Sequence, residues 1–189
     1  MKLKLLTAAA LLMAAPALAQ SPAFAPTKTL KVTRDDDTGA EGTLRWAIEE
    51  NNRNPGQYRI ELQGGAVIRP LKELPPIIGP VVLENPDHAR TGSYASIDGS
   101  AYVIGEGTKA CPGAVAGQYG TNVRTTTNPG LILRDTKGVE IRGLEVRNFC
   151  IGILLNRASD NVIADNLITG NKGGAGIMLT GDDGTGKST

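Results

Sequence analysis

Two stretches of this sequence repeat 23 residues apart, and no other feature restricts the possible folds so strongly. GVEIRGLEVRN (residues 138–148) aligns with NVIADNLITGN (residues 161–171). The alignment matches Val139 with Val162, Leu144 with Leu167, Asn148 with Asn171, Leu131 and Ile132 with Leu154 and Leu155, Arg134 with Arg157, and Leu154 and Leu155 with Ile177 and Met178. Repeats of this length, with short apolar runs between small polar corners, are typical of solenoid proteins.

The repeat predicts strands and leaves no room for helices. Its apolar runs are short, and the segments between them are too brief for helical crossovers. Each repeat must therefore consist of strands that pair in parallel with those of the next repeat. We predict an all-β fold, a parallel β-helix solenoid, as one domain over residues 20–189. Asn148 and Asn171 would then stack and hydrogen-bond through their amides, unless they are two unrelated turn residues.

The segment TLRWAIEENNRN, residues 43–54, is the one expected helix. Thr43 is a suitable N-cap, and Leu44, Ala47 and Ile48 fall on one helical face. A solenoid exposes apolar interior and unpaired strand edges at its end, so a short amphipathic helix before the first strands would serve as a cap. Trp46 falls off the apolar face and is expected to cover a neighbouring loop, with sugar stacking as the alternative.

Several of these segments resemble a known family. GTLRWAI at residues 42–48, RIEL at 59–62 and SIDG at 96–99 are similar to the N-terminal part of pectate lyases and related right-handed parallel β-helix proteins. The resemblance implies a right-handed coil with a helical cap at its N-terminal end. It also implies a protein that binds or acts on polysaccharide. The same cap and coils occur in lyases, hydrolases, epimerases and non-catalytic adhesins, so fold does not determine activity.

The resemblance also identifies one candidate metal ligand. Pectate lyases hold calcium with aspartates on successive strands, and calcium prefers several converging carboxylate oxygens. The segment IADN at residues 163–166 resembles one such strand, which makes Asp165 the transferable calcium candidate. The other aspartate position falls on residues 151–153, which carry no carboxylate, and Asn166 stands where the family has histidine. No catalytic residue is assigned.

Two classes of function therefore stay open. The first is a pectate-lyase-like carbohydrate-active enzyme, which would need acidic and arginine residues beyond those in this sequence. The second is a non-catalytic secreted or cell-surface adhesin or scaffold, which needs only the solenoid. Because the strand from residue 177 begins a coil without its remaining strands, we expect the chain to be C-terminally incomplete and residues 20–189 alone to be inactive.

The first 19 residues predict export. MKLKLLTAAALLMAAPALA has two lysines, an apolar core and a small-residue end, as a cleaved signal peptide does. The apolar run is shorter than the roughly 20 residues that span a bilayer. We predict a signal peptide at residues 1–19, no membrane span after its cleavage, and a secreted, periplasmic or cell-surface protein.

Charge and a motif near the end bear on possible ligands. Of 20 basic residues two lie in the leader, so the remaining basic residues nearly balance the 19 acidic ones. This balance gives no reason to expect a nucleic acid partner.

Gly181, Gly186, Lys187 and Ser188 match a phosphate-binding P-loop. No helix follows them to seat a nucleotide, so we predict a corner loop and no nucleotide.

The remaining polar candidates each have two interpretations. Cys111 and Cys150 are an even count in an exported chain, which favours one disulfide over two unpaired cysteines. Residues 35–37 are three aspartates, a solvated turn or a calcium ligand. Arg134 and Arg157 would align as a cationic stripe or as a solvated edge, with Asp160 beside Arg157. His88, the only histidine, is expected in a loop, with a role as general base as the alternative.

Overall fold

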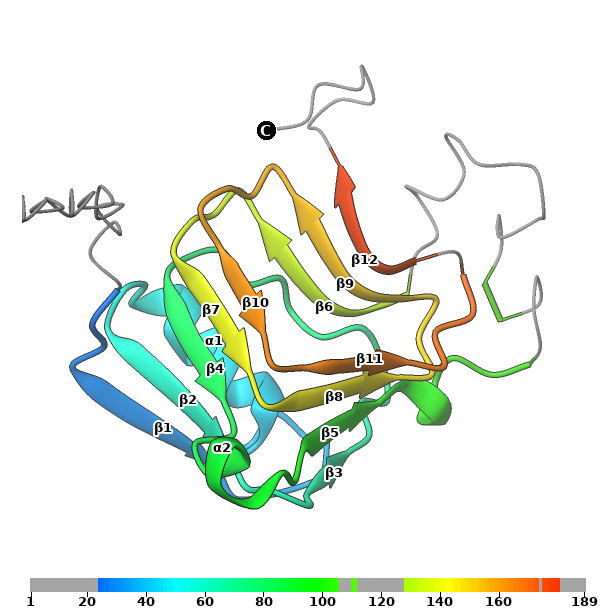
Figure 1. The fold of residues 1–189 in the computed structure, drawn as a ribbon, viewed down its shortest axis with the longest axis horizontal. Helices are drawn as coiled ribbons and strands as arrows, with labels where there is room; N and C mark the ends of the chain where they lie inside the picture. Colours follow the sequence, from blue (N-terminus) through cyan, green and yellow to red (C-terminus); the bar gives the residue numbers. More distant parts are fainter. Residues whose placement is uncertain (1–23, 106–109, 112–127, 174, 181–189) are drawn as a thin grey trace, which may run out of the picture.

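We describe a computed structural model of the chain, over residues 24–105, 110–111, 128–173 and 175–180. Short strands dominate it, with few helices (Figure 1). In chain order the elements are β1 Lys28–Val32, α1 Leu44–Arg53, β2 Tyr58–Leu62, β3 Val67–Ile68, β4 Val81–Glu84, α2 His88–Thr91, β5 Ala95–Asp98, a 3₁₀ turn Gly99–Ala101, β6 Pro129–Arg134, β7 Val139–Arg142, β8 Leu144–Arg147, β9 Ile151–Asn156, β10 Val162–Ala164, β11 Leu167–Thr169 and β12 Ala175–Thr180.

The strands form three parallel sheets. The first has the order β1-β2-β4-β7-β10, the second β11-β8-β5-β3, and the third β12-β9-β6. From β4 onward the chain visits the three sheets in the same order, so that β7, β8 and β9 are followed by β10, β11 and β12 (Figure 1). The prediction of mainly parallel strands with few helices is confirmed.

The core lies between the sheets. Strands β1 to β11 contribute apolar side chains to it, and the register places them level with those of the neighbouring strand. In the first sheet this gives the row Leu30, Ile60, Leu83, Ile141 and Ile163. The second sheet has the row Ile68, Ile97, Val146 and Ile168. These residues belong to one core cluster, except that Leu30, Ile163 and Ile168 are partly buried and pack against it, so stacking of like side chains holds successive strands in register.

The repeat distance from the sequence was wrong by one residue. Val162 pairs with Glu140 and Leu167 with Glu145, a step of 22 residues, whereas Asn156 bonds to Thr180 across a step of 24. A one-residue shift moves a side chain to the opposite face of a strand. Val162 is accordingly exposed on the outer face. The 23-residue distance is an average over corners of unequal length.

The expected amide stack of Asn148 on Asn171 is also wrong, because Gly170 lies level with Asn148. Asparagine side chains instead satisfy backbone groups at the corners. The side chain oxygens of Asn161, Asn166 and Asn171 accept from the N–H groups of Val139, Leu144 and Phe149 at 2.9, 3.0 and 3.0 Å. An N–H group at a corner has no backbone acceptor in the next strand. The side-chain oxygen of an asparagine one repeat later accepts its hydrogen bond instead.

Helix α1 begins where the sequence predicts. Thr43 is its N-cap and accepts a hydrogen bond from the N–H of Trp46 at 3.2 Å. Leu44, Ala47 and Ile48 are buried in the core cluster, and Trp46 packs against it partly buried. Trp46 therefore contributes to the core.

The aspartates at residues 35–37 do not form one solvated turn. The Asp37 side chain is buried, and its carboxylate accepts two hydrogen bonds from the guanidinium of Arg45 at 2.8 and 2.9 Å. The N–H of Leu71 donates to the same carboxylate at 2.8 Å. The Asp36 side chain is partly exposed and pairs with Arg34 at 2.8 Å. Asp37 thus joins the segment before α1 to the segment after β3.

Gly152 marks a tight contact between the second and third sheets. It lies level with Gly130 and Gly176 in the third sheet. A Cβ at Gly152 would meet the Gly176 carbonyl oxygen at 2.5 Å and the Ile168 side chain at 2.6 Å, whereas at Gly176 the nearest atom would be 3.1 Å away.

We therefore expect Gly152→Ala to lower the free energy of unfolding by about 1–3 kcal/mol, because backbone must move to admit the methyl group. Gly176→Ala, in the same row, is the matched control and should change it by less than about 1 kcal/mol. Urea unfolding followed by circular dichroism measures both. Equal effects of the two substitutions would contradict the close packing at Gly152.

Two predictions fall outside the described residues. The leader, residues 1–19, and the P-loop-like residues from Gly181 to Ser188 both lie there. Among the residues that are described, no helix has the length and apolar character needed to cross a membrane.

Candidate functional site

The second sheet carries a group of charged side chains on its outer face. Ile97 of β5 and Val146 of β8 point into the core, so their strand neighbours point outward. The register places Ser96 beside Glu145 and Asp98 beside Arg147. Arg69, one residue after β3, reaches the same place. We name these residues the Asp98 cluster: Arg69, Ser96, Asp98, Glu145 and Arg147.

Asp98 lies at the centre of the cluster with only 6% of its side chain exposed. It accepts hydrogen bonds from the Asn148 amide at 2.8 Å and from the Ser100 N–H at 3.0 Å. Arg147 approaches it to 3.3 Å and Arg69 to 3.8 Å. Burial alone would raise the pKa of Asp98, but these hydrogen bonds and the charge of Arg147 together hold the pKa below its usual value. Asp98 is therefore a fixed negative charge.

Arg147 joins the two carboxylates of the cluster. Its Nη1 lies 3.2 Å from Glu145, while Glu145 accepts a hydrogen bond from the Ser96 hydroxyl. The Nε of Arg147 is buried and has no hydrogen-bond partner among the described residues. The arginine side chains are more exposed than the aspartate, with 32% of Arg147 and 52% of Arg69 accessible to solvent. The cluster thus presents guanidinium groups outward over carboxylates.

A hollow of about 500 Å³ lies next to the cluster. Its wall includes Val32, Val67, Arg34 and Arg69, and one carboxylate, that of Asp35. Arg69 therefore belongs both to the hollow and to the Asp98 cluster. Small-molecule sites have volumes of this order and combine an apolar wall with a few polar groups. Guanidinium groups recognise carboxylates through paired hydrogen bonds. This arrangement suits a small anionic ligand.

Asp165 lies away from the Asp98 cluster, at the corner between β10 and β11. Its backbone has a positive φ of 56°, and its exposed carboxylate lies 3.3 Å from Arg142, which also bonds Glu140. Over the described ranges, no three His, Cys, Asp or Glu side chains are grouped so that they could hold a metal ion. Calcium binding by Asp165 stays a prediction, and the residue's observed partner is a cation.

Other candidates from the sequence have local partners. The Nδ1 of His88 lies 3.0 Å from the Ser93 carbonyl oxygen, and its ring packs on Tyr94 with centroids 4.3 Å apart. Arg134 and Arg157 do not align, because Arg134 lies opposite Asn156. Arg157 forms an ion pair with Asp135. The proposed cationic stripe is therefore not present.

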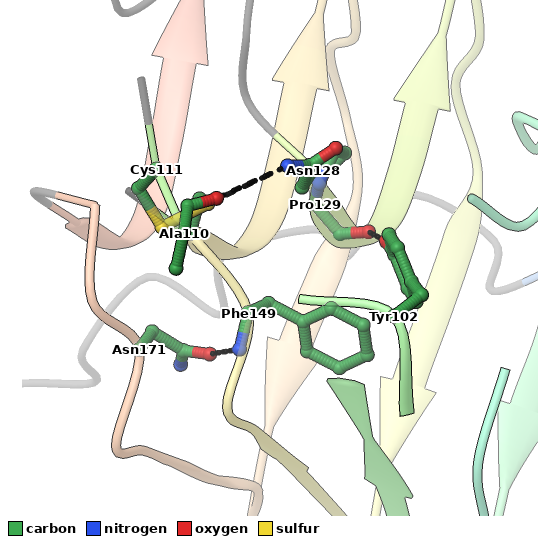
Figure 2. Close-up of a disulfide and its surroundings, with 8 residues drawn as sticks. Tyr102, Ala110, Cys111, Asn128, Pro129, Phe149 and Asn171 are labelled. Carbon is green, nitrogen blue, oxygen red and sulfur yellow. Dashed lines mark hydrogen bonds between the residues drawn. A yellow bond between two sulfur atoms is a disulfide. The ribbon is translucent and has the colours of Figure 1, made fainter. Parts of the chain in front are cut away.

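Cys111 and Cys150 form a disulfide with a Cα–Cα distance of 5.4 Å. Figure 2 shows it beside Ala110 and Asn128, with a hydrogen bond of 3.4 Å from the Asn128 amide to the Ala110 carbonyl. Both cysteines are buried. Cys150 lies two residues after Asn148, which bonds to Asp98. The disulfide therefore anchors the chain that supports the cluster.

The sequence alone did not identify Arg69, Ser96, Glu145 or Arg147 as a site. The signal present was alternation: Ile97 and Val146 each stand between two polar residues, which predicts polar side chains on one outer face. Ser96 and Glu145 are 49 residues apart, however, and only strand pairing brings them together. Asp98 was noticed solely as part of the SIDG motif.

Comparisons with known proteins place the chain near two groups. Residues 100–186 match the model of a family described as periplasmic copper-binding protein (NosD), which is a family of right-handed parallel β-helix proteins. The chain is also 52% identical over 171 residues to a 3-dehydroshikimate dehydratase of Acinetobacter baylyi. That alignment covers 88% of this chain and 35% of the relative, so the chain spans about a third of the relative's length.

The match to a periplasmic family confirms the predicted location, secreted or periplasmic. The metal in the description of this family is copper, whereas calcium is the metal expected from the sequence. Copper favours thiolate, thioether and imidazole ligands. Residues 100–186 contain no histidine and a single methionine, Met178, and both cysteines are joined in the disulfide. The side chains of the matched segment therefore do not fit a copper site.

Proposed function

We propose that the protein containing this chain is an exported dehydratase that removes water from 3-dehydroshikimate. One observation carries the proposal: 52% identity over 171 residues to a dehydratase named for that substrate. The alignment covers 88% of this chain, so it includes the strands that carry the Asp98 cluster. The hollow and arginines beside it suit a small carboxylic acid better than a long polymer.

We further propose that the three sheets are coils of a right-handed parallel β-helix solenoid and that α1 caps its N-terminal end. The parallel register and the repeated order of the sheets support a β-helix. The burial of Leu44, Ala47 and Ile48 in the common core supports the cap. The pectate-lyase-like motifs at residues 42–48 and 96–99 support membership of that superfamily.

The chemistry of a dehydratase and that of a lyase are related. Both eliminate an oxygen leaving group after a proton is removed beside an electron-withdrawing group. In 3-dehydroshikimate that group is a ketone, and loss of one water leaves a dihydroxybenzoate. Such a site needs a base, an acid for the departing hydroxyl, and an anchor for the carboxylate. Asp98 is ionised and held by several donors, which suits it to positioning cationic groups and not to donating a proton.

The test is dehydration by the complete gene product. We expect the purified protein to convert 3-dehydroshikimate into a dihydroxybenzoate, measured by ultraviolet absorbance of the aromatic ring and by the mass of one lost water. Shikimate, which has a hydroxyl in place of the ketone, is the matched control and should not react. Failure to dehydrate 3-dehydroshikimate would refute this proposal.

The second candidate is a polysaccharide lyase or polysaccharide-binding β-helix protein. The resemblance of residues 42–48 and 96–99 to segments of pectate lyases supports it. Polygalacturonate is the substrate for this alternative. We expect residues 20–189 to release no unsaturated uronide, with or without calcium. Product that disappears with Asp165→Asn would support the lyase.

A further inference from the structure

We propose that Arg69 and Arg147 bind the carboxylate of a small cyclic substrate on the outer face of the second sheet, with Asp98 as the positioning residue beneath them. This inference rests on the proposed function, because it names the groups that would hold the carboxylate of 3-dehydroshikimate. It concerns binding only and assigns no proton transfer.

The first observation that supports a carboxylate site is the relative exposure of the charged groups. Asp98 lies beneath the surface, whereas Arg69 and Arg147 extend over it toward solvent. A ligand approaching from solvent therefore meets guanidinium groups first. The negative charge of Asp98 offsets part of the repulsion between the two arginines and keeps them close together.

The second observation is that both arginines have N–H donors left over for a ligand. A guanidinium group has five N–H donors, and Arg147 uses Nη1 toward Glu145 and Nη2 toward Asp98 at 3.2 and 3.3 Å. Its Nε is buried and therefore closed to a ligand, but Nη1 and Nη2 each carry a second N–H group. Arg69 lies 3.8 Å from Asp98, which is an ion pair but too long for a hydrogen bond. Both arginines thus keep donors for a planar carboxylate, which binds best to two parallel N–H groups.

The third observation is the hollow next to Arg69, which offers space for the ring of the ligand. Arg69 stands at the edge of both the cluster and the hollow, and Val67, whose neighbour Ile68 points into the core, helps to form the wall. A ring attached to the bound carboxylate would reach this wall. The wall combines apolar side chains such as Val32 and Val67 with polar ones such as Thr33 and Gln63, a mixture found in small-molecule sites.

Asp98 fixes the geometry. It is held from below by the Asn148 amide and the Ser100 N–H, at 2.8 and 3.0 Å, so its carboxylate cannot easily follow a moving arginine. Asn148 comes two residues before the disulfide-bonded Cys150, which ties this support to a covalent link. Arg147 is consequently held close to one orientation before ligand arrives, which lowers the entropy cost of binding.

The experiment measures binding and catalysis separately in the complete gene product. The binding probes are 3,4-dihydroxybenzoate and its amide, titrated by calorimetry. We expect the acid to bind at least about 10-fold more tightly than the amide, and Arg147→Gln and Arg69→Gln each to weaken acid binding about 10- to 100-fold. Arg147→Lys should recover part of the loss, because it restores charge without the paired donors.

Arg59→Gln is the matched control. Arg59 is also a half-exposed arginine paired with a glutamate on an outer sheet face, and it should leave acid binding unchanged. With 3-dehydroshikimate as substrate, Arg147→Gln should raise KM by about the same factor and change kcat less. Circular dichroism and the thermal midpoint verify folding. If Arg147→Gln does not fold, the surface variant Arg69→Gln carries the test.

The outcomes separate this inference from the proposed function. Arginine-dependent binding of the acid without any dehydration would leave the inference standing and refute the dehydratase. Dehydration with an unchanged KM in both arginine variants would refute the inference and leave the dehydratase standing. Equal binding of acid and amide, or no binding of either probe to the unmodified protein, would also overturn the inference.

Discussion

Asp37→Asn is expected to lower the free energy of unfolding by about 3–5 kcal/mol, because it leaves a buried guanidinium without its counter-charge. Only 2% of the Asp37 side chain and 7% of the Arg45 side chain are exposed to solvent. The substitution keeps the shape of the side chain. It removes the charge and replaces one acceptor with an amide donor that faces the donors of Arg45.

The location of this ion pair increases the effect. Arg45 also donates to the carbonyl oxygens of Lys72 and Glu73 at 3.0 and 2.9 Å. Asp37 and Arg45 therefore hold the segment before α1, the helix itself and the segment after β3 together. Loss of the carboxylate should loosen all three, and the thermal midpoint should fall with the denaturant midpoint.

Asp36→Asn is the matched control, since it is the same substitution at the neighbouring residue. Asp36 pairs with Arg34 at the surface, where solvent screens the interaction, and such exposed pairs contribute little to stability. Urea unfolding of both variants, followed by circular dichroism, decides the matter. An Asp37 variant as stable as the Asp36 variant would show that the buried pair is not needed for the fold.

Reduction of the disulfide is expected to lower the free energy of unfolding by about 3–4 kcal/mol in the chain-entropy model. Cys111 and Cys150 are separated by 39 residues, and the bond closes this loop in the unfolded chain. Reduction also frees the segment that carries Ala110 from the start of β9. The measurement is urea unfolding with and without a phosphine reductant.

The double variant Cys111→Ser, Cys150→Ser is the control, and its stability should not respond to the reductant. Intact-mass analysis after alkylation of exported protein tests the bond directly. No alkyl group should be added before reduction and two should be added after it. Two alkylated cysteines before reduction would contradict the disulfide.

Much of the local structure followed from the sequence because its causes are local. Thr43 caps α1 through a hydrogen bond to a residue three positions away. Asp160, expected at a corner, has a positive φ of 51°, which aspartate tolerates better than most residues. Short apolar runs between such corners were sufficient to predict parallel strands.

The register did not follow from the sequence. Offsets of 22 and of 24 residues both place apolar residues near apolar residues. The intermediate offset of 23 residues gave the best match between the two amino-acid segments. The close packing at Gly152 did not follow from the sequence either: the Gly176 carbonyl and the side chain of Ile168 leave no space there for a Cβ. Packing between distant segments, not local preference, sets this contact.

The sequence by itself determined that this chain forms short parallel strands with polar corners and a capped helix, since each depends on residues within a few positions of one another. Only the tertiary structure decided that Arg69, Asp98 and Arg147 meet on one outer face and that Asp37 is buried against Arg45. The physical reason is that electrostatic and packing interactions act through space. Strand pairing brings together residues from three different repeats, and the number of residues between them in the sequence does not reveal that they are neighbours in space.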